Sequence, residues 1–85
     1  MQKEHIEKQV FAFLEKLPPK QKAQMSIKIL QLFNDPRPHD SIKLKGGNGD
    51  FRVDIGEYRI LYSFSVNDGI RILKVGKRND GEVYN

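Results

Sequence analysis

The sequence contains no cysteine, so neither a disulfide nor a thiolate metal site can hold this chain together. It also lacks any apolar run that approaches the ~20 residues needed to cross a bilayer. Its N-terminus has no apolar region typical of a signal peptide. At 85 residues, the chain is near the lower end of what folds on its own hydrophobic core. We therefore predict one cytoplasmic domain over residues 1–85, held by packing of helices on a sheet, with no membrane contact.

Histidine, the most frequent general acid–base in enzymes, occurs only as His5 and His39. Neither has a Ser or Asp placed to suggest a catalytic triad, and no residues have metal-ligand spacing. We expect both histidines on the solvated surface. The glycine-rich residues 46–49 match no phosphate-binding fingerprint and are interpreted as a flexible connector. The sequence thus predicts neither a metal nor a cofactor.

Positive charge is concentrated in the second half of the chain. Residues 42–78 carry eight Lys or Arg against four Asp or Glu, whereas the first 41 residues carry seven against five. Such an excess favours a polyanionic partner, either nucleic acid or an acidic protein. Charge alone does not choose between them.

The first part of the chain has the pattern of two helices. An apolar stripe at helical spacing predicts an amphipathic helix and comprises Ile6, Val10, Phe13, Leu14 and Leu17. Pro18 ends this helix, and Pro19 suits the first turn of a second helix over residues 19–34. The second helix is apolar around most of its circumference. We expect the sheet and the first helix to cover part of it and a partner protein to cover the rest.

Residues 51–62 consist of two alternating runs around a two-residue break, which predicts a β-hairpin. Gly56 at the first central position favours a type II′ turn, because glycine readily adopts positive φ. Pairing across this turn sets Asp54 opposite Arg59. One face of the hairpin is then apolar, and the other carries Arg52, Asp54 and Arg59.

A turn at residues 67–69 and an apolar run over residues 70–75 predict a third strand, and residues 42–45 form a short extended piece. The predicted fold class is α+β, with an N-terminal helical hairpin packed on an antiparallel β-meander.

The pairing of the third strand decides which basic side chains share a face. A three-residue loop with Gly69 at positive φ would place Arg59 near Lys77. Arg78 would then share the face of Arg59 only if Gly76 hosted a β-bulge, or would reach it from the end of the strand.

Arginines on an open sheet face do not by themselves indicate function. Asp54 paired with Arg59 across the hairpin would be a surface ion pair worth ~0–1 kcal/mol. The residues alone therefore leave two interpretations open, a solvated structural pair and an anion-binding site.

Five segments, in order and with suitable spacing, resemble the RelE branch of the RelE/ParE toxin superfamily, the toxin halves of type II toxin–antitoxin pairs. These segments are Lys43-Leu44-Lys45-Gly46, Phe51-Arg52-Val53, Gly56-Glu57-Tyr58-Arg59-Ile60-Leu61-Tyr62, Val75-Gly76-Lys77-Arg78 and Glu82-Val83-Tyr84. The resemblance covers nearly the whole chain. It implies a short strand that ends at Ile6, whereas the apolar stripe alone predicts that the first helix extends through this residue.

RelE-like toxins are ribosome-dependent endoribonucleases that cut messenger RNA in the ribosomal A site. They use the 2′-OH of the message as the nucleophile on the adjacent phosphate, without a metal. The resemblance therefore implies that this chain is a toxin and an mRNA interferase. Its implied partners are the ribosome, mRNA and a cognate antitoxin, with no cofactor.

The family's motifs fall on three positions with implied catalytic roles: Arg59, Arg78 and Tyr84. Four further bases are implied to hold RNA phosphates: Lys43, Lys45, Arg52 and Lys77. Where some members place a second base two residues after the position of Arg52, this chain has Asp54. That departure removes a basic group from the site.

Two alternative functions remain open. A ParE-like toxin has the same fold but inhibits DNA gyrase without nuclease chemistry, and such relatives typically lack the basic and tyrosine set. A non-catalytic RNA- or DNA-binding module would need the positive charge but not Tyr84. The presence of Arg59, Arg78 and Tyr84 together favours the nuclease.

Overall fold

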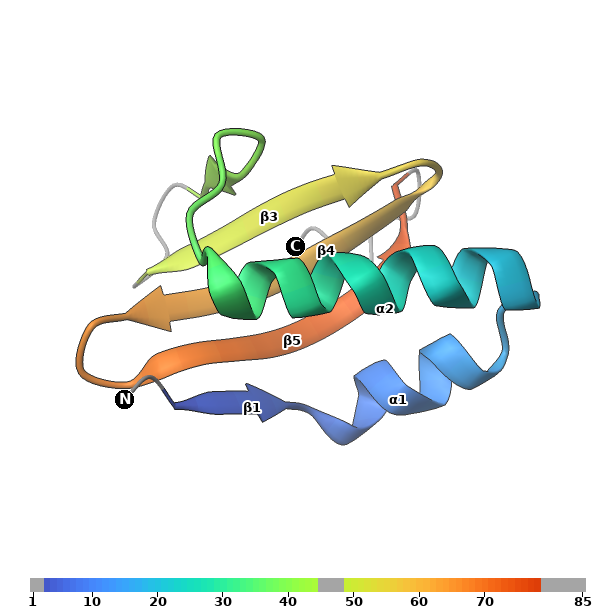
Figure 1. Ribbon diagram of the computed structural model, residues 1–85, viewed down its shortest axis with the longest axis horizontal. Coiled ribbons are helices and arrows are strands. Elements are labelled where there is room, and N and C mark those ends of the chain that lie inside the picture. Colours follow the sequence, from blue (N-terminus) through green and yellow to red (C-terminus); the bar gives the residue numbers. More distant parts are fainter. Residues whose placement is uncertain (1–2, 45–48, 79–85) are drawn as a thin grey trace.

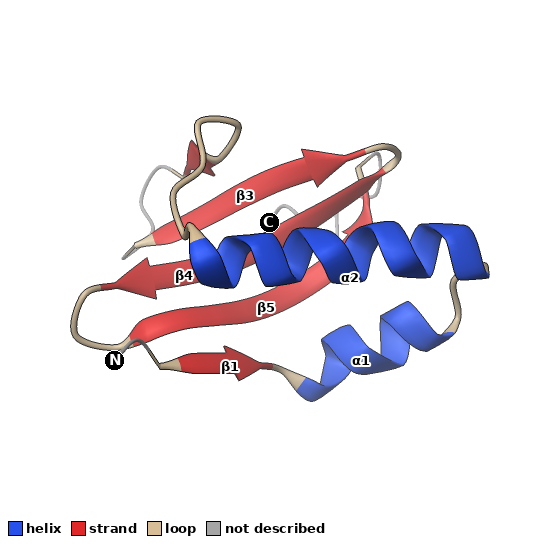
Figure 2. Ribbon diagram, in the orientation of Figure 1, coloured by secondary structure: helices blue, strands red, loops and turns tan. Residues whose placement is uncertain are grey.

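Two helices cover one face of a five-stranded sheet in the computed structural model of this protein (Figures 1 and 2). The structure describes residues 3–44 and 49–78. Its elements are β1 (Glu4–Ile6), α1 (Lys8–Glu15), α2 (Pro19–Asn34), β2 (Ile42–Lys43), β3 (Asp50–Ile55), β4 (Tyr58–Ser65) and β5 (Gly69–Lys77). The strand order is β1-β5-β4-β3-β2, with β1 parallel to β5 and the other neighbours antiparallel. The predicted α+β class and meander are confirmed, and β1 makes the sheet mixed.

The chain enters the fold as a strand. The prediction that the first helix extends through Ile6 is wrong, whereas the short strand implied by the resemblance is confirmed. Ile6 pairs with Ile72 of β5, and the backbone N–H of Glu7 donates to the carbonyl of Ile72 at 3.0 Å. The edge of β5 carries backbone groups that need partners, and a three-residue strand supplies them.

Pro19 lies in the first turn of α2, as predicted, whereas α1 ends at Glu15, before Leu17 and Pro18. Buried side chains of both helices face the sheet and each other: Val10, Leu14, Met25, Ile29 and Leu32. The predicted surplus of apolar surface on α2 is also present, because Ile27 is 54% exposed and Leu30 is 63% exposed. Of the described helices, neither is long and apolar enough to cross a membrane.

The hairpin of β3 and β4 has the predicted register, with Asp54 opposite Arg59. Gly56 has φ of 57°, and no other residue type has positive φ in the described part of the chain. The residue after Gly56 therefore has negative φ, as in a type II′ turn, whereas a type I′ turn needs positive φ at both central residues.

The pairing of β4 with β5 differs from the prediction. Arg59 lies opposite Gly76 rather than Lys77, and the hairpin loop comprises residues 66–68. The ladder is irregular after Leu61, where it skips Leu73. The irregularity lies there and not at Gly76, so of the two predicted routes for Arg78 the bulge at Gly76 is not observed.

The extra residue in β5 has a physical cause in the core. Ile70 and Ile72 are buried, and strict alternation would next point Lys74 at the helices. Skipping Leu73 turns Val75 inward instead, where it is 5% exposed opposite Ile60. The sheet thereby keeps a continuous apolar face.

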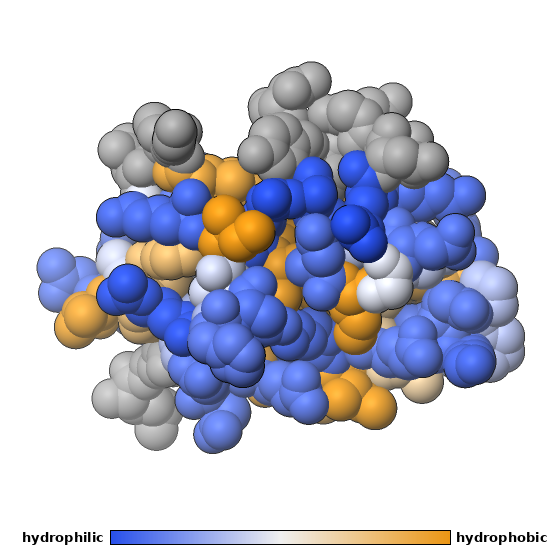
Figure 3. Space-filling view, turned by 90° about the horizontal axis from the view of Figure 1, so that it is seen from above, coloured by the Kyte–Doolittle hydropathy of each residue, from blue (hydrophilic) through white to orange (hydrophobic). Residues whose placement is uncertain are grey.

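The core lies between this face and the helices. Tyr62 is fully buried, stacks on Phe51 with ring centroids 5.5 Å apart, and donates its hydroxyl to the carbonyl of Pro36 at 2.8 Å. This bond ties the loop after α2 to the sheet. On the face seen from above, most of the coloured residues are hydrophilic, and apolar residues show only as separate small areas (Figure 3).

Candidate functional site

Two of the predicted site arginines lie on the sheet face that α1 and α2 do not cover. In β3, Arg52 and Asp54 alternate with the buried Phe51 and Val53, so their side chains point away from the helices. In β4, Arg59 lies directly opposite Asp54 and shares its face. The predicted grouping of Arg52, Asp54 and Arg59 is therefore present in the structure.

Arg78 reaches the same point from the end of β5. Its backbone N–H donates to the carbonyl of Glu57 at 2.8 Å, and its Nη1 donates to the carbonyl of Gly56 at 3.2 Å. Because Gly76 lies opposite Arg59, alternation places Arg78 two residues later on the face of Arg59. The observed register brings together the two arginines that the predicted register separated.

The carboxylate of Asp54 is the centre of this group. It accepts hydrogen bonds from Arg59 Nε at 2.7 Å and from Arg59 Nη2 at 3.3 Å. Arg78 Nε lies 3.5 Å and Arg52 Nη1 lies 3.7 Å from the same carboxylate. Hydrogen bonding from Arg59 lowers the pKa of Asp54 below its ordinary value, partial burial opposes this shift, and the charges of Arg59, Arg52 and Arg78 add to it.

A hollow of about 400 Å³ lies beside the cluster and is lined by Gly56, Glu57, Arg59, Lys77 and Arg78. Guanidinium groups remain charged and match phosphate or carboxylate oxygens with two hydrogen bonds each. The arrangement can therefore hold an anion next to Asp54. Among the described residues, no group of three or more His, Asp or Glu is arranged to hold a metal ion.

The remaining predicted site residues are placed differently. Lys43 lies opposite Phe51, and so on the helix-covered face at the edge of the sheet, away from the arginines. Lys77 lies opposite Tyr58 and is exposed, and it lines the hollow next to Arg78. Lys45 and Tyr84 lie outside the described residues. The RNA contacts and catalytic roles of all these residues stay predictions.

The central position of Asp54 is the feature that sequence reasoning missed. The hairpin pattern did predict its pairing with Arg59, which the structure confirms. The contacts with Arg52 and Arg78 depend on the register of β5, and the predicted register was wrong there. Both histidines are exposed, as predicted.

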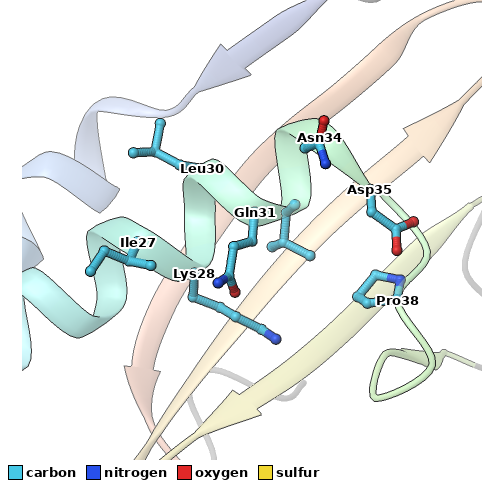
Figure 4. A pocket seen from close by; sticks show the side chains of 8 residues that line it. Ile27, Lys28, Leu30, Gln31, Asn34, Asp35 and Pro38 are labelled. Atoms are coloured by element: carbon cyan, nitrogen blue, oxygen red, sulfur yellow. The ribbon is translucent and has the colours of Figure 1, made fainter.

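A second hollow, of about 450 Å³, lies beside α2 and has a different character (Figure 4). The exposed Ile27 and Leu30 line it, together with Pro38 from the loop after α2. An ion pair between Lys28 Nζ and Asp40 Oδ2, 2.8 Å apart, links α2 to that loop. This surface offers apolar contact rather than a set of reactive groups.

Comparison with solved structures identifies the fold. A chain of the archaeal RelE–RelB complex from Pyrococcus horikoshii is 32% identical, with a TM-score of 0.79 over 92% of this chain and 96% of that chain. A chain of the RelBE2 toxin–antitoxin complex from Mycobacterium tuberculosis is 25% identical, with a TM-score of 0.74 over 91% and 98%. The isolated RelE toxin of E. coli, 21% identical, shares the fold with a TM-score of 0.76 over 99% and 92%.

No protein-family model and no curated protein sequence matches the chain. The archaeal match extends over almost the full length of both chains, and the isolated toxin shows which component of such complexes has this fold. The chain belongs to the RelE family of toxins.

Proposed function

We propose that this protein is the toxin of a type II toxin–antitoxin pair and cuts messenger RNA in the ribosomal A site. The observation that carries the proposal is the convergence of Arg52, Arg59 and Arg78 on one point of the sheet face. Such a cluster suits a reaction at a phosphodiester, because guanidinium groups bind phosphate oxygens and keep their charge. Membership of the RelE family supports the same activity.

The proposed reaction is attack of the 2′-OH of the message on the adjacent phosphorus. A base takes the hydroxyl proton, negative charge builds up on the phosphorane, and the bond to the 5′ oxygen breaks as that oxygen gains a proton. Arg59 and Arg78 would stabilise the phosphorane, and Arg52 would hold a flanking phosphate. Arg59 is well suited to this role, since its side chain is only 13% exposed and is fixed before RNA arrives.

Tyr84 is the proposed general base on the family's pattern. A free phenol titrates near ~10, so it needs cationic neighbours, which generally favour the phenolate. Arginine is a poor proton donor. We therefore assign protonation of the leaving oxygen to Lys77, which lines the same hollow as Arg78, or to groups of the ribosome. Lys43 and Lys45 are proposed to hold phosphates farther along the message.

A cognate antitoxin is the proposed protein partner. Chains related to this one occur in RelE–RelB complexes. Ile27 and Leu30 on α2 are more than half exposed beside an apolar hollow, and a helical segment of an antitoxin would cover them.

Replacing both Ile27 and Leu30 by Asp should prevent neutralisation by the co-expressed antitoxin without reducing mRNA cleavage. Val66→Asp is the control, since Val66 is 91% exposed in the β4–β5 loop.

The test of the activity is induced expression followed by mapping of mRNA ends. Wild-type protein should arrest translation and produce cuts at A-site codons. Arg59→Ala and Tyr84→Phe should each reduce cleavage, by ~10²–10³-fold for the loss of one charge-stabilising donor. Arg71→Ala is the matched control, because Arg71 shares the sheet face of Arg59 but lies opposite Ser63, four residues farther along β4. It should cut like the wild type.

Other results would contradict the proposal. Arrest of DNA synthesis with intact mRNA would indicate a ParE-like gyrase inhibitor. Toxicity that survives Tyr84→Phe but is abolished by removing the arginines would indicate a non-catalytic nucleic-acid-binding module.

A further inference from the structure

The candidate site holds an anion of its own. The Asp54 carboxylate lies within 3.7 Å of a nitrogen from each of the three arginines. An incoming RNA phosphate would seek the same guanidinium groups, so it must either displace the carboxylate or share them with it. The geometry of the contacts distinguishes these outcomes.

The contacts of Arg59 and Arg78 with Asp54 are unequal. Arg59 reaches both carboxylate oxygens, at 2.7 and 3.3 Å, and its side chain is 13% exposed. Arg78 reaches one oxygen at 3.5 Å, and its side chain is 54% exposed. A short two-point contact with little solvent access is hard to exchange, whereas a long single contact on an exposed side chain is readily given up.

We infer that Asp54 is a built-in counter-ion that stays on Arg59 when a phosphate binds, while the phosphate takes Arg78 from it. This inference rests on the proposed function, since its ligand is an RNA phosphodiester. Asp54 is then a positioning residue for Arg59 and a competitor for Arg78. Asp54 occupies the position where some RelE-like toxins have a basic residue, and the inference gives this acidic residue a role of its own.

This arrangement has an electrostatic consequence. Three guanidinium groups and one carboxylate leave the cluster with a net charge of +2. Asp54→Asn preserves the shape of the side chain and raises this charge to +3. Phosphate affinity must then rise, and the Nε–H of Arg59, which Asp54 engages in the wild type, must become more available to the anion, because a neutral amide is a weaker acceptor than a carboxylate.

The test is a titration of the full chain with inorganic phosphate, followed by NMR of the Nε–H groups of Arg59 and Arg78. In the wild type, the Arg78 signal should shift and the Arg59 signal should not. In Asp54→Asn, both should shift, and affinity should rise by about 3–10-fold at low salt, with the gain shrinking at high salt. Asp50→Asn is the matched control, because Asp50 lies at the other end of β3, opposite Ser63. Its phosphate affinity should stay within about twofold of the wild type.

The inference is overturned if the wild-type Arg59 signal moves together with that of Arg78, an observation that needs no variant. It is also overturned if Asp54→Asn binds phosphate no more tightly, or if the charge-retaining Asp54→Glu binds it as tightly as Asp54→Asn. The titration involves neither ribosome nor cleavage. Normal phosphate responses without mRNA cleavage would therefore count against the nuclease alone, and mRNA cleavage with unchanged affinities would count against the counter-ion alone.

Discussion

Two glycines with positive φ allow a backbone penalty to be separated from a steric one. Gly56 has φ of 57°, and a Cβ added there would meet no atom within 4 Å. Gly69 has φ of 79°, but a Cβ there would lie 2.8 Å from both the N and C atoms of Lys3 and closer still to its carbonyl oxygen. We predict that Gly69→Ala destabilises the fold much more than Gly56→Ala does.

The magnitudes follow from these environments. Ala at positive φ costs ~1–2 kcal/mol, which is the whole expected effect at Gly56. At Gly69 the same penalty applies, and the backbone before β1 must also move, which adds ~1–3 kcal/mol. That movement weakens a specific bond, because the backbone N–H of Ile70 donates to the carbonyl of Lys3 at 2.9 Å.

Urea unfolding measures both free energies of unfolding, and hydrogen exchange locates the damage. In Gly69→Ala, hydrogen exchange at the Ile70 amide should accelerate by more than the loss in free energy of unfolding accounts for. In Gly56→Ala, the change in exchange at this amide should match the change in free energy of unfolding. Equal destabilisation by the two variants would refute the steric argument. So would an unchanged local exchange rate at Ile70, because β1 would then not be held against Gly69 as described.

Three further predictions concern single side chains. Tyr62→Phe removes the hydroxyl bonded to Pro36 and should cost ~1 kcal/mol in urea unfolding. Burial raises the pKa of Tyr62 above its ordinary 10.0, so wild-type stability should fall as pH rises above that value, and less in the Phe variant. The pKa of Asp54 in the folded protein lies below its ordinary 3.8, so ionised Asp54 stabilises the fold above pH 3.8. This stabilisation is lost as the pH falls through the lower folded pKa. Acid unfolding of Asp54→Asn should not show that loss. Asp40→Asn breaks an exposed ion pair with Lys28 and should change the free energy of unfolding by no more than ~1 kcal/mol.

Most of the fold could be predicted because its signals are local. The register of the first hairpin follows from a two-residue turn with Gly56 at its first central position, and the structure confirms it. The boundary between the helices follows from Pro18 and Pro19 in the same way. In each case the residues that decide the conformation are neighbours in the sequence.

The errors arose where the decision is not local. Ile6 fits the apolar stripe of a helix, yet it forms a strand because β5, more than sixty residues later, presents an edge to pair with. The skipped Leu73 is likewise set by which side chains the core accepts, not by the turn that precedes β5. Neither cause can be derived from the pattern of the segment itself.

The arginine cluster around Asp54 was predicted only in part. Arg52, Asp54 and Arg59 were placed together correctly because they belong to one hairpin. Arg78 directly follows β5, so its face depends on every residue between the β4–β5 loop and Gly76. An error of one residue there moves a side chain to the opposite face of the sheet.

The core and the candidate site are therefore coupled through β5. Skipping Leu73 gives Val75 to the core, where it is 5% exposed, and the same shift leaves Gly76 opposite Arg59. Two residues later, Arg78 falls on the face of Asp54. If Leu73 were paired in a regular ladder, Lys74 would face the helices and Arg78 would point away from Asp54. The shift that keeps a lysine out of the core thus also brings the guanidinium of Arg78 to Asp54, so the two faces of this strand cannot change independently.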